Sequence, residues 1–191
     1  MNKEYKIAIV GLGYVGLPLA IAFSEHFKVI GFDINLDRIN SLNNSVDSNG
    51  DIQFTKNNNI FFTNNSNEIS DANIYIITVP TPVTSDNIPD LTIIERASVI
   101  VANLLKKDDI VIYESTVYPG VTEDVCVPLL EKASNLKYNV DFYCGYSPER
   151  ISPGADKYTL QNIVKITSGS TKKVAEEVDG LYNKIIKAGT Y

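Results

Sequence analysis

A glycine-rich turn near the N-terminus constrains the fold of this chain more than any other feature. The segment IAIVGLGYVGLPLAIAFSEHFKVIGFD (residues 7–33) contains an apolar run, three glycines spaced G-x-G-x-x-G, a stretch of helical character and a second apolar run that ends in Asp33. In a strand–turn–helix unit, Gly11 allows the tight turn, Gly13 lets the backbone approach a pyrophosphate, and Gly16 permits close packing of the helix on the strand. The segment therefore predicts a dinucleotide-binding β-α-β unit.

The acid at the end of the second apolar run bears on the choice of dinucleotide. Asp33 follows Gly11 by about 20 residues, the spacing at which a carboxylate accepts hydrogen bonds from the adenosine ribose. Because a carboxylate at this place repels a 2′-phosphate, the sequence favours NAD over NADP. Arg38 has two interpretations, as a residue that covers the adenine or ribose edge or as a solvated residue of the following helix. The first helix, which begins near Tyr14, directs its N–H groups and positive dipole end toward the phosphates.

Beyond this unit the chain alternates between apolar runs of strand length and segments with helical periodicity. The runs are apolar on both alternations, as expected for strands that are covered on both faces. This alternation predicts a Rossmann-type α/β fold, a doubly wound parallel sheet with helices on both faces. The expected strands are 5–10, 28–32, 60–63, 73–79, 109–115, 140–145 and 163–168, and the expected helices are 14–26, 35–42, 92–106, 122–134 and 172–187.

Local signals refine these elements. Asp90 stands just before the helix at 92–106 and is expected to cap it. Pro128 lies inside the 122–134 pattern, where it predicts a kink or an early break. The stretch 43–59, rich in Asn, Ser and Asp, is interpreted as a surface excursion between the second and third strands. The expected apolar face of the helix at 92–106 consists of Ile93, Ala97, Ile100, Val101, Leu104 and Leu105.

The composition excludes several classes of function. With 17 basic against 23 acidic residues and no cluster of Lys or Arg, the chain lacks the basic face of a nucleic-acid-binding protein. No apolar stretch reaches the roughly 18 residues of a membrane span, and the chain begins without a leader sequence, so we expect a cytoplasmic protein with no membrane partner. Cys126, Cys144 and His26 lack the spacing of metal ligands, so no metal site is expected. Both cysteines are interpreted chiefly as buried packing residues, with Cys144 the better placed for reactivity, and His26 as a surface residue.

Polar residues follow three consecutive strands, at the edge of the sheet where ligands bind in open α/β folds. Thr81 and Thr116 offer hydroxyl groups, and Glu149 offers a carboxylate that can accept a proton directly or through water. Each also has a structural interpretation. Thr81 is equally consistent with a local turn cap, Thr116 with a hydrogen bond at a helix start, and Glu149 with a surface ion pair to Arg150.

Four motifs, in order along the chain, resemble one enzyme family. GLGYVGLPLA, VPTP followed by PDLT, ESTVYPG and GYSPERISPG are similar to motifs of the UDP-glucose/GDP-mannose dehydrogenase family. The forms YESTVYPGVTE and CGYSPERISPG are most similar to its UDP-N-acetylhexosamine 6-dehydrogenase branch, which acts on UDP-N-acetylglucosamine or UDP-N-acetylgalactosamine. The resemblance covers nearly the whole chain. It implies an NAD-dependent oxidoreductase that oxidises the sugar C6 alcohol to a uronic acid in two steps, through cysteine-bound intermediates, for bacterial surface polysaccharides.

The resemblance also implies roles for individual residues. Glu149 is expected to assist proton transfer or to position water, and Thr116 to lie near the reacting carbon. The implied catalytic residues are therefore Thr116 and Glu149. The implied cofactor-binding residues are Gly11, Gly13, Tyr14, Val15, Gly16, Asp33, Arg38, Thr81 and Thr116, and the implied substrate-binding residues are Glu149, Arg150 and Ile151.

Two departures from the family pattern qualify this expectation. Pro153 stands about where the UDP-glucose branch has a second glutamate, which argues against UDP-glucose as substrate. The family's nucleophilic cysteine, its central dimerisation helix and its UDP-sugar domain lie beyond Tyr191, so residues 1–191 are expected to form the NAD-binding domain alone. We expect this domain to bind NAD without turnover, in a full-length homodimer whose second domain completes the UDP-sugar site. The alternatives are a UDP-glucose or UDP-N-acetylmannosamine dehydrogenase of the same family, or a non-catalytic NAD-sensing module.

Overall fold

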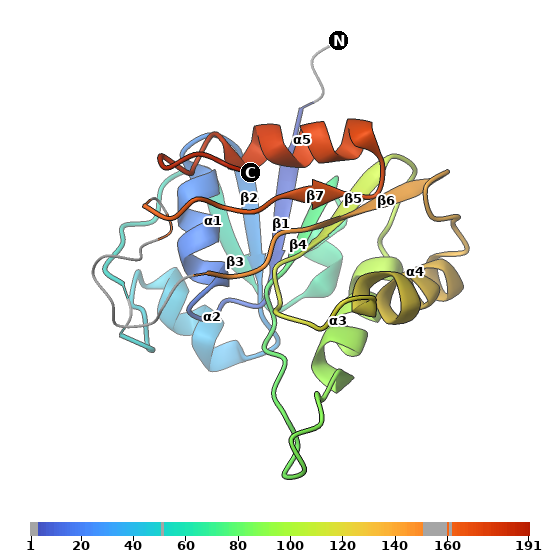
Figure 1. Cartoon of the computed structure of the whole chain (residues 1–191). Coiled ribbons are helices and arrows are strands. Elements are labelled where there is room, and N and C mark those ends of the chain that lie inside the picture. Colours follow the sequence, from blue (N-terminus) through green and yellow to red (C-terminus); the bar gives the residue numbers. More distant parts are fainter. Residues whose placement is uncertain (1–3, 51, 151–159, 161) are drawn as a thin grey trace.

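The computed structural model describes residues 4–50, 52–150, 160 and 162–191. Its core is a seven-stranded sheet in the order β3-β2-β1-β4-β5-β6-β7 (Figure 1). The first six strands are parallel, and the order reverses between β1 and β4, which creates a topological switch point there. The strands are β1 (Lys6–Val10), β2 (Lys28–Phe32), β3 (Ile60–Thr63), β4 (Ile74–Ile77), β5 (Asp109–Tyr113), β6 (Phe142–Tyr146) and β7 (Ser168–Gly169).

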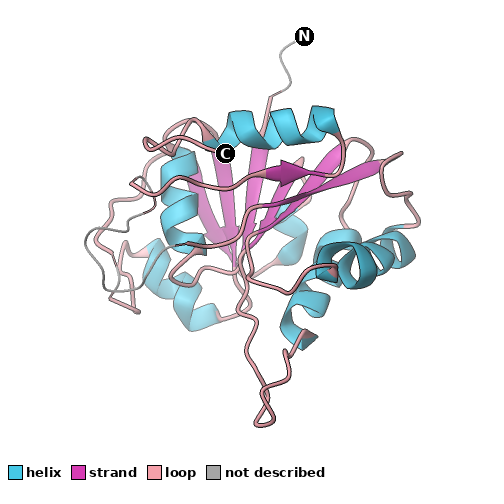
Figure 2. Ribbon diagram, in the orientation of Figure 1, coloured by secondary structure: helices cyan, strands magenta, loops and turns pink. Residues whose placement is uncertain are grey.

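Helices cover both faces of the sheet, as the alternation of elements predicted (Figure 2). The side chains of each strand point alternately to the two faces, so that Ile7 and Ile9 belong to one core and Ala8 and Val10 to the other. The first core packs against α1 (Gly16–Ser24), α2 (Leu36–Asn43) and α5 (Lys172–Tyr182), and the second against α3 (Thr92–Ala102) and α4 (Val127–Ser134). A short 3₁₀ helix, η1 (Ser66–Ile69), precedes β4.

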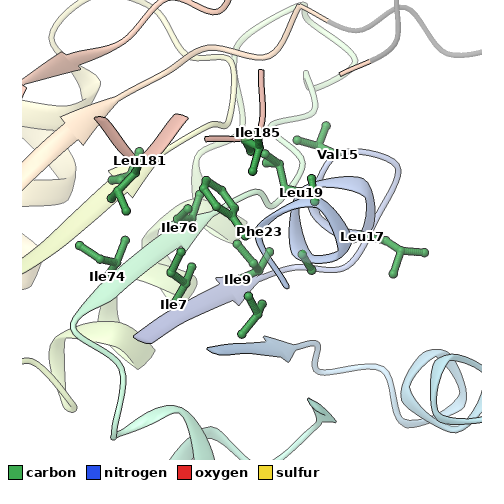
Figure 3. Packing of buried hydrophobic residues seen from close by; sticks show 14 of the residues in the cluster. Ile7, Ile9, Val15, Leu17, Leu19, Phe23, Ile74, Ile76, Leu181 and Ile185 are labelled. Carbon is green, nitrogen blue, oxygen red and sulfur yellow. The ribbon is translucent and has the colours of Figure 1, made fainter. Parts of the chain in front are cut away.

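The first core joins elements from both ends of the chain. Figure 3 shows Phe23 of α1 beside Ile9 of β1, with Leu181 and Ile185 above them. The ring of Phe23 meets the ring of Tyr182 edge to face, with 5.5 Å between their centroids. This contact places α5 over the centre of the sheet.

The prediction of a parallel strand at 163–168 is wrong. The observed strand, β7, contains only Ser168 and Gly169 and pairs antiparallel with β6. The preceding segment runs beside the end of the chain instead, where the Lys165 N–H donates to the Gly189 carbonyl oxygen and the Tyr191 N–H donates to the Lys165 carbonyl oxygen. The apolar run is interrupted by a lysine that must bury its charge beside a partner, which ordinary strand periodicity does not anticipate.

The expected apolar face of the helix at 92–106 is also partly wrong. The observed helix α3 ends at Ala102, and its buried side includes Ile94 and Ser98, whereas Ile93 is 37% exposed. Ala97 and Val101 are buried as expected, so the observed face overlaps the expected one and is turned toward Ile94 and Ser98. The N-cap residue of α3 is Leu91 and not the expected Asp90, but Asp90 Oδ1 still accepts a hydrogen bond of 2.9 Å from the Thr92 N–H in the first turn.

Pro128 lies in the first turn of α4, where the missing N–H of proline leaves no hydrogen bond unmade. A wide π-helical turn, η2 (Thr122–Cys126), leads into α4 and accounts for the irregularity that the proline predicted. Cys126 and Cys144 are both buried, and His26 is exposed beyond the end of α1. Across the described ranges, no helix combines the length and the apolar character needed to cross a membrane.

Candidate dinucleotide site

A cavity of about 700 Å³ lies at the switch point, beyond the carboxyl ends of β1, β4 and β5. This volume is within the range of small-molecule binding pockets. The ends of these strands converge on the lower edge of the sheet (Figure 2), which brings their following loops together. The glycine-rich loop forms one wall, and residues 80–82, residues 114–116 and Glu149 form the other. The cavity thus lies at the strand ends, where the sequence predicted the site.

The three glycines of the loop have different surroundings. Gly11 has a φ of +96°, and its N–H donates to the Phe32 carbonyl oxygen at 2.8 Å. A Cβ on Gly16 would lie 1.9 Å from the Gly11 carbonyl oxygen and 2.5 Å from the Thr78 hydroxyl oxygen, so no side chain fits there. Gly13, by contrast, has open space around the place of a Cβ and lines the cavity. The first and third glycines are thus required by packing, and the second faces room for a ligand.

The loop leads into α1 at the cavity wall. Tyr14, which is 47% exposed, and Val15 both line the cavity directly before Gly16, the first residue of α1. The first N–H groups of a helix have no partners within the helix and carry its positive partial charge. This end of α1 is suited to a phosphate.

Asp33 holds the loop from the end of β2. Its Oδ2 accepts a hydrogen bond of 2.8 Å from the Leu12 N–H, and its Oδ1 accepts one of 2.9 Å from the Asn35 N–H. A carboxylate has about four acceptor sites, so two remain for the hydroxyl groups of a ribose. Asp33 lines the cavity, in agreement with its predicted place.

Arg38 is a buried structural residue of α2, which makes the interpretation as a solvated helix residue wrong. Its Nε donates to the Leu12 carbonyl oxygen at 2.9 Å, and its Nη1 donates to Asp47 at 2.5 Å and to the Ser48 hydroxyl at 3.1 Å. Burial favours the neutral form of Asp47, but the Arg38 bond and two backbone N–H groups outweigh it and hold the pKa of Asp47 below its usual value. The Nη2 atom is buried without a hydrogen-bond partner among the described residues. Arg38 therefore fixes the glycine loop to the excursion after α2.

The two predicted threonines connect neighbouring strand ends. The Thr81 hydroxyl donates to the Thr116 carbonyl oxygen at 2.6 Å, which replaces the local turn cap considered from sequence. Ser115, which the sequence did not single out, donates to the Val79 carbonyl oxygen at 2.6 Å. Thr116 itself is exposed and lines the cavity. These bonds hold the loops after β4 and β5 in one position at the cavity wall.

Glu149 lies at the same wall, with its side chain 8% exposed. Its N–H donates to the Glu114 carbonyl oxygen at 3.2 Å, and its Oε1 accepts from the Arg150 N–H. The interpretation as a surface ion pair with Arg150 is wrong for a carboxylate so deeply buried. Arg150 is exposed, and its guanidinium donates to the Val164 carbonyl oxygen. Ile151, the third predicted substrate residue, and Pro153 lie outside the described residues.

A buried ionic cluster beneath this wall was missed from sequence. The Lys165 ammonium lies 2.5 Å from Glu114 Oε2 and 3.8 Å from Glu149 Oε2, and it donates to the Pro148 carbonyl oxygen at 3.1 Å. The Tyr182 hydroxyl donates to Glu114 Oε1. Glu114, Lys165 and Tyr182 are each fully buried. The signals that could have found the cluster are an acid at the end of the apolar run DIVIYE and a lone lysine inside IVKIT.

Burial dominates the proton equilibria of the cluster. Loss of solvent raises the pKa of Glu114 to about 7, although the contacts with Lys165 and Tyr182 oppose the rise and Glu149 adds to it. Burial and the adjacent Glu114 raise the pKa of Tyr182 well above its usual value, so its hydroxyl remains a donor. Burial likewise raises the pKa of both Cys126 and Cys144, which keeps their thiols protonated.

Comparison with known proteins identifies the family. The model of the NAD binding domain of the UDP-glucose/GDP-mannose dehydrogenase family matches residues 5–186. The chain belongs to this family. The match confirms the resemblance predicted from the four motifs, and it confirms NAD as the cofactor of the domain.

Individual relatives of this dehydrogenase family agree with the match. UDP-N-acetyl-D-glucosamine 6-dehydrogenase from Salmonella typhi is 52% identical over 98% of the chain and 45% of its own length. The protein of the same name from Pseudomonas aeruginosa is 50% identical over 99% of the chain and 46% of its own length. The solved structure of UDP-D-ManNAc dehydrogenase from Pyrococcus horikoshii matches with a TM-score of 0.84 and 33% identity. This match covers 97% of the present chain and 46% of the Pyrococcus chain. The chain thus spans about half the length of the curated relatives it matches.

The cavity fits the dinucleotide that this family uses. Gly13 leaves open space at the loop, Asp33 retains acceptor sites, and α1 begins at the wall. In an open α/β sheet the two halves of a dinucleotide lie on either side of the switch point. The predicted adenosine side of the cavity is therefore the side with Asp33, and the predicted nicotinamide side is the wall with Thr116 and Glu149.

Proposed function

We propose that this chain is the NAD-binding part of an enzyme that oxidises the C6 alcohol of a UDP-N-acetylhexosamine to the uronic acid, in two NAD-dependent steps, for surface polysaccharide biosynthesis. The observation that carries this proposal is the identity of about half of all residues with two UDP-N-acetyl-D-glucosamine 6-dehydrogenases over nearly the whole chain. Identity to a UDP-N-acetyl-D-mannosamine dehydrogenase is lower, at 35%, which favours UDP-N-acetylglucosamine as the substrate.

The cofactor side of the proposed site uses the glycine loop and its supports. The backbone around Gly11, Gly13 and Gly16, with Tyr14 and Val15, binds the pyrophosphate, while Asp33 accepts hydrogen bonds from the adenosine ribose. Arg38 contributes to cofactor binding by holding Leu12 of the loop through its Nε, and Thr81 holds the nicotinamide side through Thr116. Bound NAD supplies the acceptor for a hydride from the sugar carbon.

The substrate side of the proposed site uses the opposite wall. Glu149 accepts a proton from the sugar hydroxyl or holds a water molecule, since it is a carboxylate at the wall of the cavity. Thr116 orients the reacting carbon through its hydroxyl. Arg150 and Ile151 contact the nucleotide sugar.

We further propose that residues 1–191 form one NAD-binding domain and that the remaining parts of the site lie outside them. Neither Cys126 nor Cys144 is suited to be the nucleophile, because both thiols are buried and protonated. The nucleophilic cysteine, the central helix and the UDP-sugar domain therefore belong to a further part of a homodimeric enzyme. Cytoplasmic location and the absence of membrane and nucleic-acid partners are part of the same proposal.

Calorimetry on the 191-residue chain tests the cofactor half of the proposal. We expect NADH to bind with a markedly lower Kd than NADPH, because Asp33 repels the 2′-phosphate. NADPH binding as tightly as NADH would contradict the role of Asp33.

A second assay follows NADH formation from NAD and UDP-N-acetylglucosamine by absorbance. We expect no turnover by the chain alone and turnover by the enzyme in which it is joined to the UDP-sugar domain. Robust turnover by the chain alone would contradict the domain assignment, and failure of the joined enzyme to oxidise any UDP-N-acetylhexosamine would contradict the substrate.

A further inference from the structure

Beneath the cavity, the described residues bring one ammonium group close to two buried carboxylates. Among the described residues, Lys165 lies between Glu114 and Glu149, at 2.5 Å from the first and 3.8 Å from the second. Its side chain is 1% exposed, and the side chains of Glu114 and Glu149 are 0% and 8% exposed. A buried ion pair needs close partners on both sides, because each charge has lost its water. One ammonium group therefore serves two carboxylates in a setting with little solvent screening.

The same lysine also fixes the loop that carries Glu149. Its ammonium donates to the Pro148 carbonyl oxygen at 3.1 Å, and the Glu149 N–H donates to the Glu114 carbonyl oxygen at 3.2 Å. The backbone of Glu149 is thus held to Glu114, the residue after β5, and the carbonyl group of the preceding Pro148 is held to Lys165. The ammonium group of Lys165 is both a hydrogen-bond donor to this loop and a positive charge near Glu149. A change in its position therefore alters both interactions.

The backbone of Lys165 is itself held in place. Its N–H and carbonyl groups bond to Gly189 and Tyr191, so the lysine can respond only through its side chain. On its other side, Glu114 is fixed by the hydroxyl of Tyr182 from α5. Among the described residues, the titratable groups that act on Glu114 are therefore Lys165, Tyr182 and Glu149, and the ammonium group of Lys165 also lies 3.8 Å from Glu149 at the cavity wall.

We propose that Lys165 is a positioning residue shared between Glu114 and Glu149, and that its ammonium group couples the placement of Glu149 at the cavity to the protonation state of Glu114. When Glu114 is ionised, it holds the ammonium as its closest partner. When Glu114 takes up a proton, this attraction is lost, and the ammonium group of Lys165 interacts mainly with Glu149. This role rests on the proposed function, in which Glu149 handles the substrate proton.

The pH at which the coupling operates follows from the environment of Glu114. Burial raises the pKa of this carboxyl group to about 7, so its protonation state changes near neutral pH. Lys165 lies within 4 Å of both carboxylates, so a proton that binds to Glu114 changes the charge balance around Glu149. Glu149 is therefore expected to sense a proton that binds to Glu114.

Carbon-13 NMR of the side-chain carboxyl groups in the ¹³C-glutamate-labelled 191-residue chain tests the coupling directly. The resonances of Glu114 and Glu149 are assigned from their loss in Glu114→Gln and Glu149→Gln, and their shifts are followed from pH 5 to pH 9. We expect Glu114 to titrate near pH 7 and the Glu149 resonance to show a step at the same pH. In Glu114→Gln this step in the Glu149 resonance is expected to vanish.

Two further variants separate coupling from a simple loss of structure. Glu123→Gln removes an exposed carboxylate elsewhere and is expected to leave the step in Glu149 unchanged. Lys165→Met, where it folds, is expected to abolish the step in Glu149 while Glu114 still titrates. If Glu114 had only a structural role, Glu114→Gln would shift the Glu149 resonance at every pH, and the pH-dependent step would remain.

Clear outcomes would overturn the proposal. It fails if Glu114 titrates while Glu149 shows no step, if the step persists in Glu114→Gln, or if Glu114 does not titrate between pH 5 and pH 9. NADH binding measured on the same samples keeps the two proposals apart. If the wild-type chain binds NADH but its Glu149 resonance shows no step, only the coupling is contradicted. If the wild-type chain shows the step but does not bind NADH, only the proposed function is contradicted.

Discussion

The two walls of the cavity are built by different physical means. On the adenosine side, Asp33 and Arg38 hold the glycine loop through its backbone, with a carboxylate on the Leu12 N–H and a guanidinium on the Leu12 carbonyl oxygen. On the opposite side, the buried ammonium group of Lys165 lies near two carboxylates, those of Glu114 and Glu149. The first wall depends mainly on shape and on local hydrogen bonds, including one within the buried Arg38–Asp47 ion pair, and the second depends on a cation near two carboxylates. Changes of size should therefore damage the first wall, and changes of charge or pH should damage the second.

The largest expected effect comes from removing the charge of Lys165. Lys165→Met leaves Glu114 buried without its closest cation, and breaking a buried ion pair in this way costs about 3–5 kcal/mol. We expect this loss in the free energy of unfolding measured with urea at pH 8. The double variant Lys165→Met with Glu114→Gln should recover most of the loss, because it removes both charges. Equal stability of the single and double variants would show that charge does not govern this wall.

Adding one carbon atom at Gly16 tests the dependence of the other wall on shape. A Cβ there would lie 1.9 Å from the Gly11 carbonyl oxygen, so the loop must shift, at a cost of about 1–3 kcal/mol. We expect Gly16→Ala to lower the thermal midpoint and to abolish NADH binding.

The matched control is Gly13→Ala, since nothing lies near the place of its Cβ. It should leave the thermal midpoint almost unchanged and weaken NADH binding alone. A large loss of stability in Gly13→Ala would remove the distinction between packing and ligand-facing glycines.

The charge-dependent wall should also respond to pH. The pKa of Glu114 rises from 4.5 in the unfolded chain to about 7 in the folded protein, so the folded state binds more protons between these values. The stabilisation is fully present below pH 4.5 and is lost as the pH rises through 7, and at 1.36 kcal/mol per pKa unit it reaches about 3 kcal/mol at most. We expect the wild-type chain to lose stability relative to Glu114→Gln as the pH is raised from 5 to 8. Parallel stability profiles for the two proteins across this range would contradict the shift.

A smaller effect is expected at Asp33. Asp33→Asn keeps an acceptor for the Leu12 N–H and removes the negative charge that faces the ribose. Loss of a charged hydrogen bond is worth about 1.5–3 kcal/mol, so NADH affinity should fall by at least tenfold, with a smaller fall for NADPH. Asp37→Asn, an exposed change in α2, is the control and should alter neither affinity. An unchanged ratio of NADPH to NADH affinity in Asp33→Asn would show that Asp33 does not select the cofactor.

The same contrast explains what the sequence could predict. Gly11, Gly16 and Asp33 work through neighbours in one β-α-β unit, so a local spacing contains the information. Glu114 is 51 residues from Lys165 and 68 from Tyr182 in the chain, and no local periodicity records such a pairing. The expected parallel strand that contains Lys165 was wrong as well, because Lys165 pairs with the segment around Thr190 and buries its side chain beside Glu114. Arg38 was misread for a different reason, since its cationic end is buried by Asp47 and Ser48 of the irregular excursion just after α2, where no periodic pattern reports a contact.

The pairing of the last three residues with the segment 165–167 has a mechanical consequence. Gly189 and Tyr191 bond to the backbone of Lys165, and Tyr191 also accepts from the Thr167 N–H. Any displacement of residue 191 is therefore transmitted through backbone hydrogen bonds to the residue whose ammonium lies between the two carboxylates. A force applied at residue 191 would reach the cavity wall with Glu149 through these backbone bonds and the side chain of Lys165.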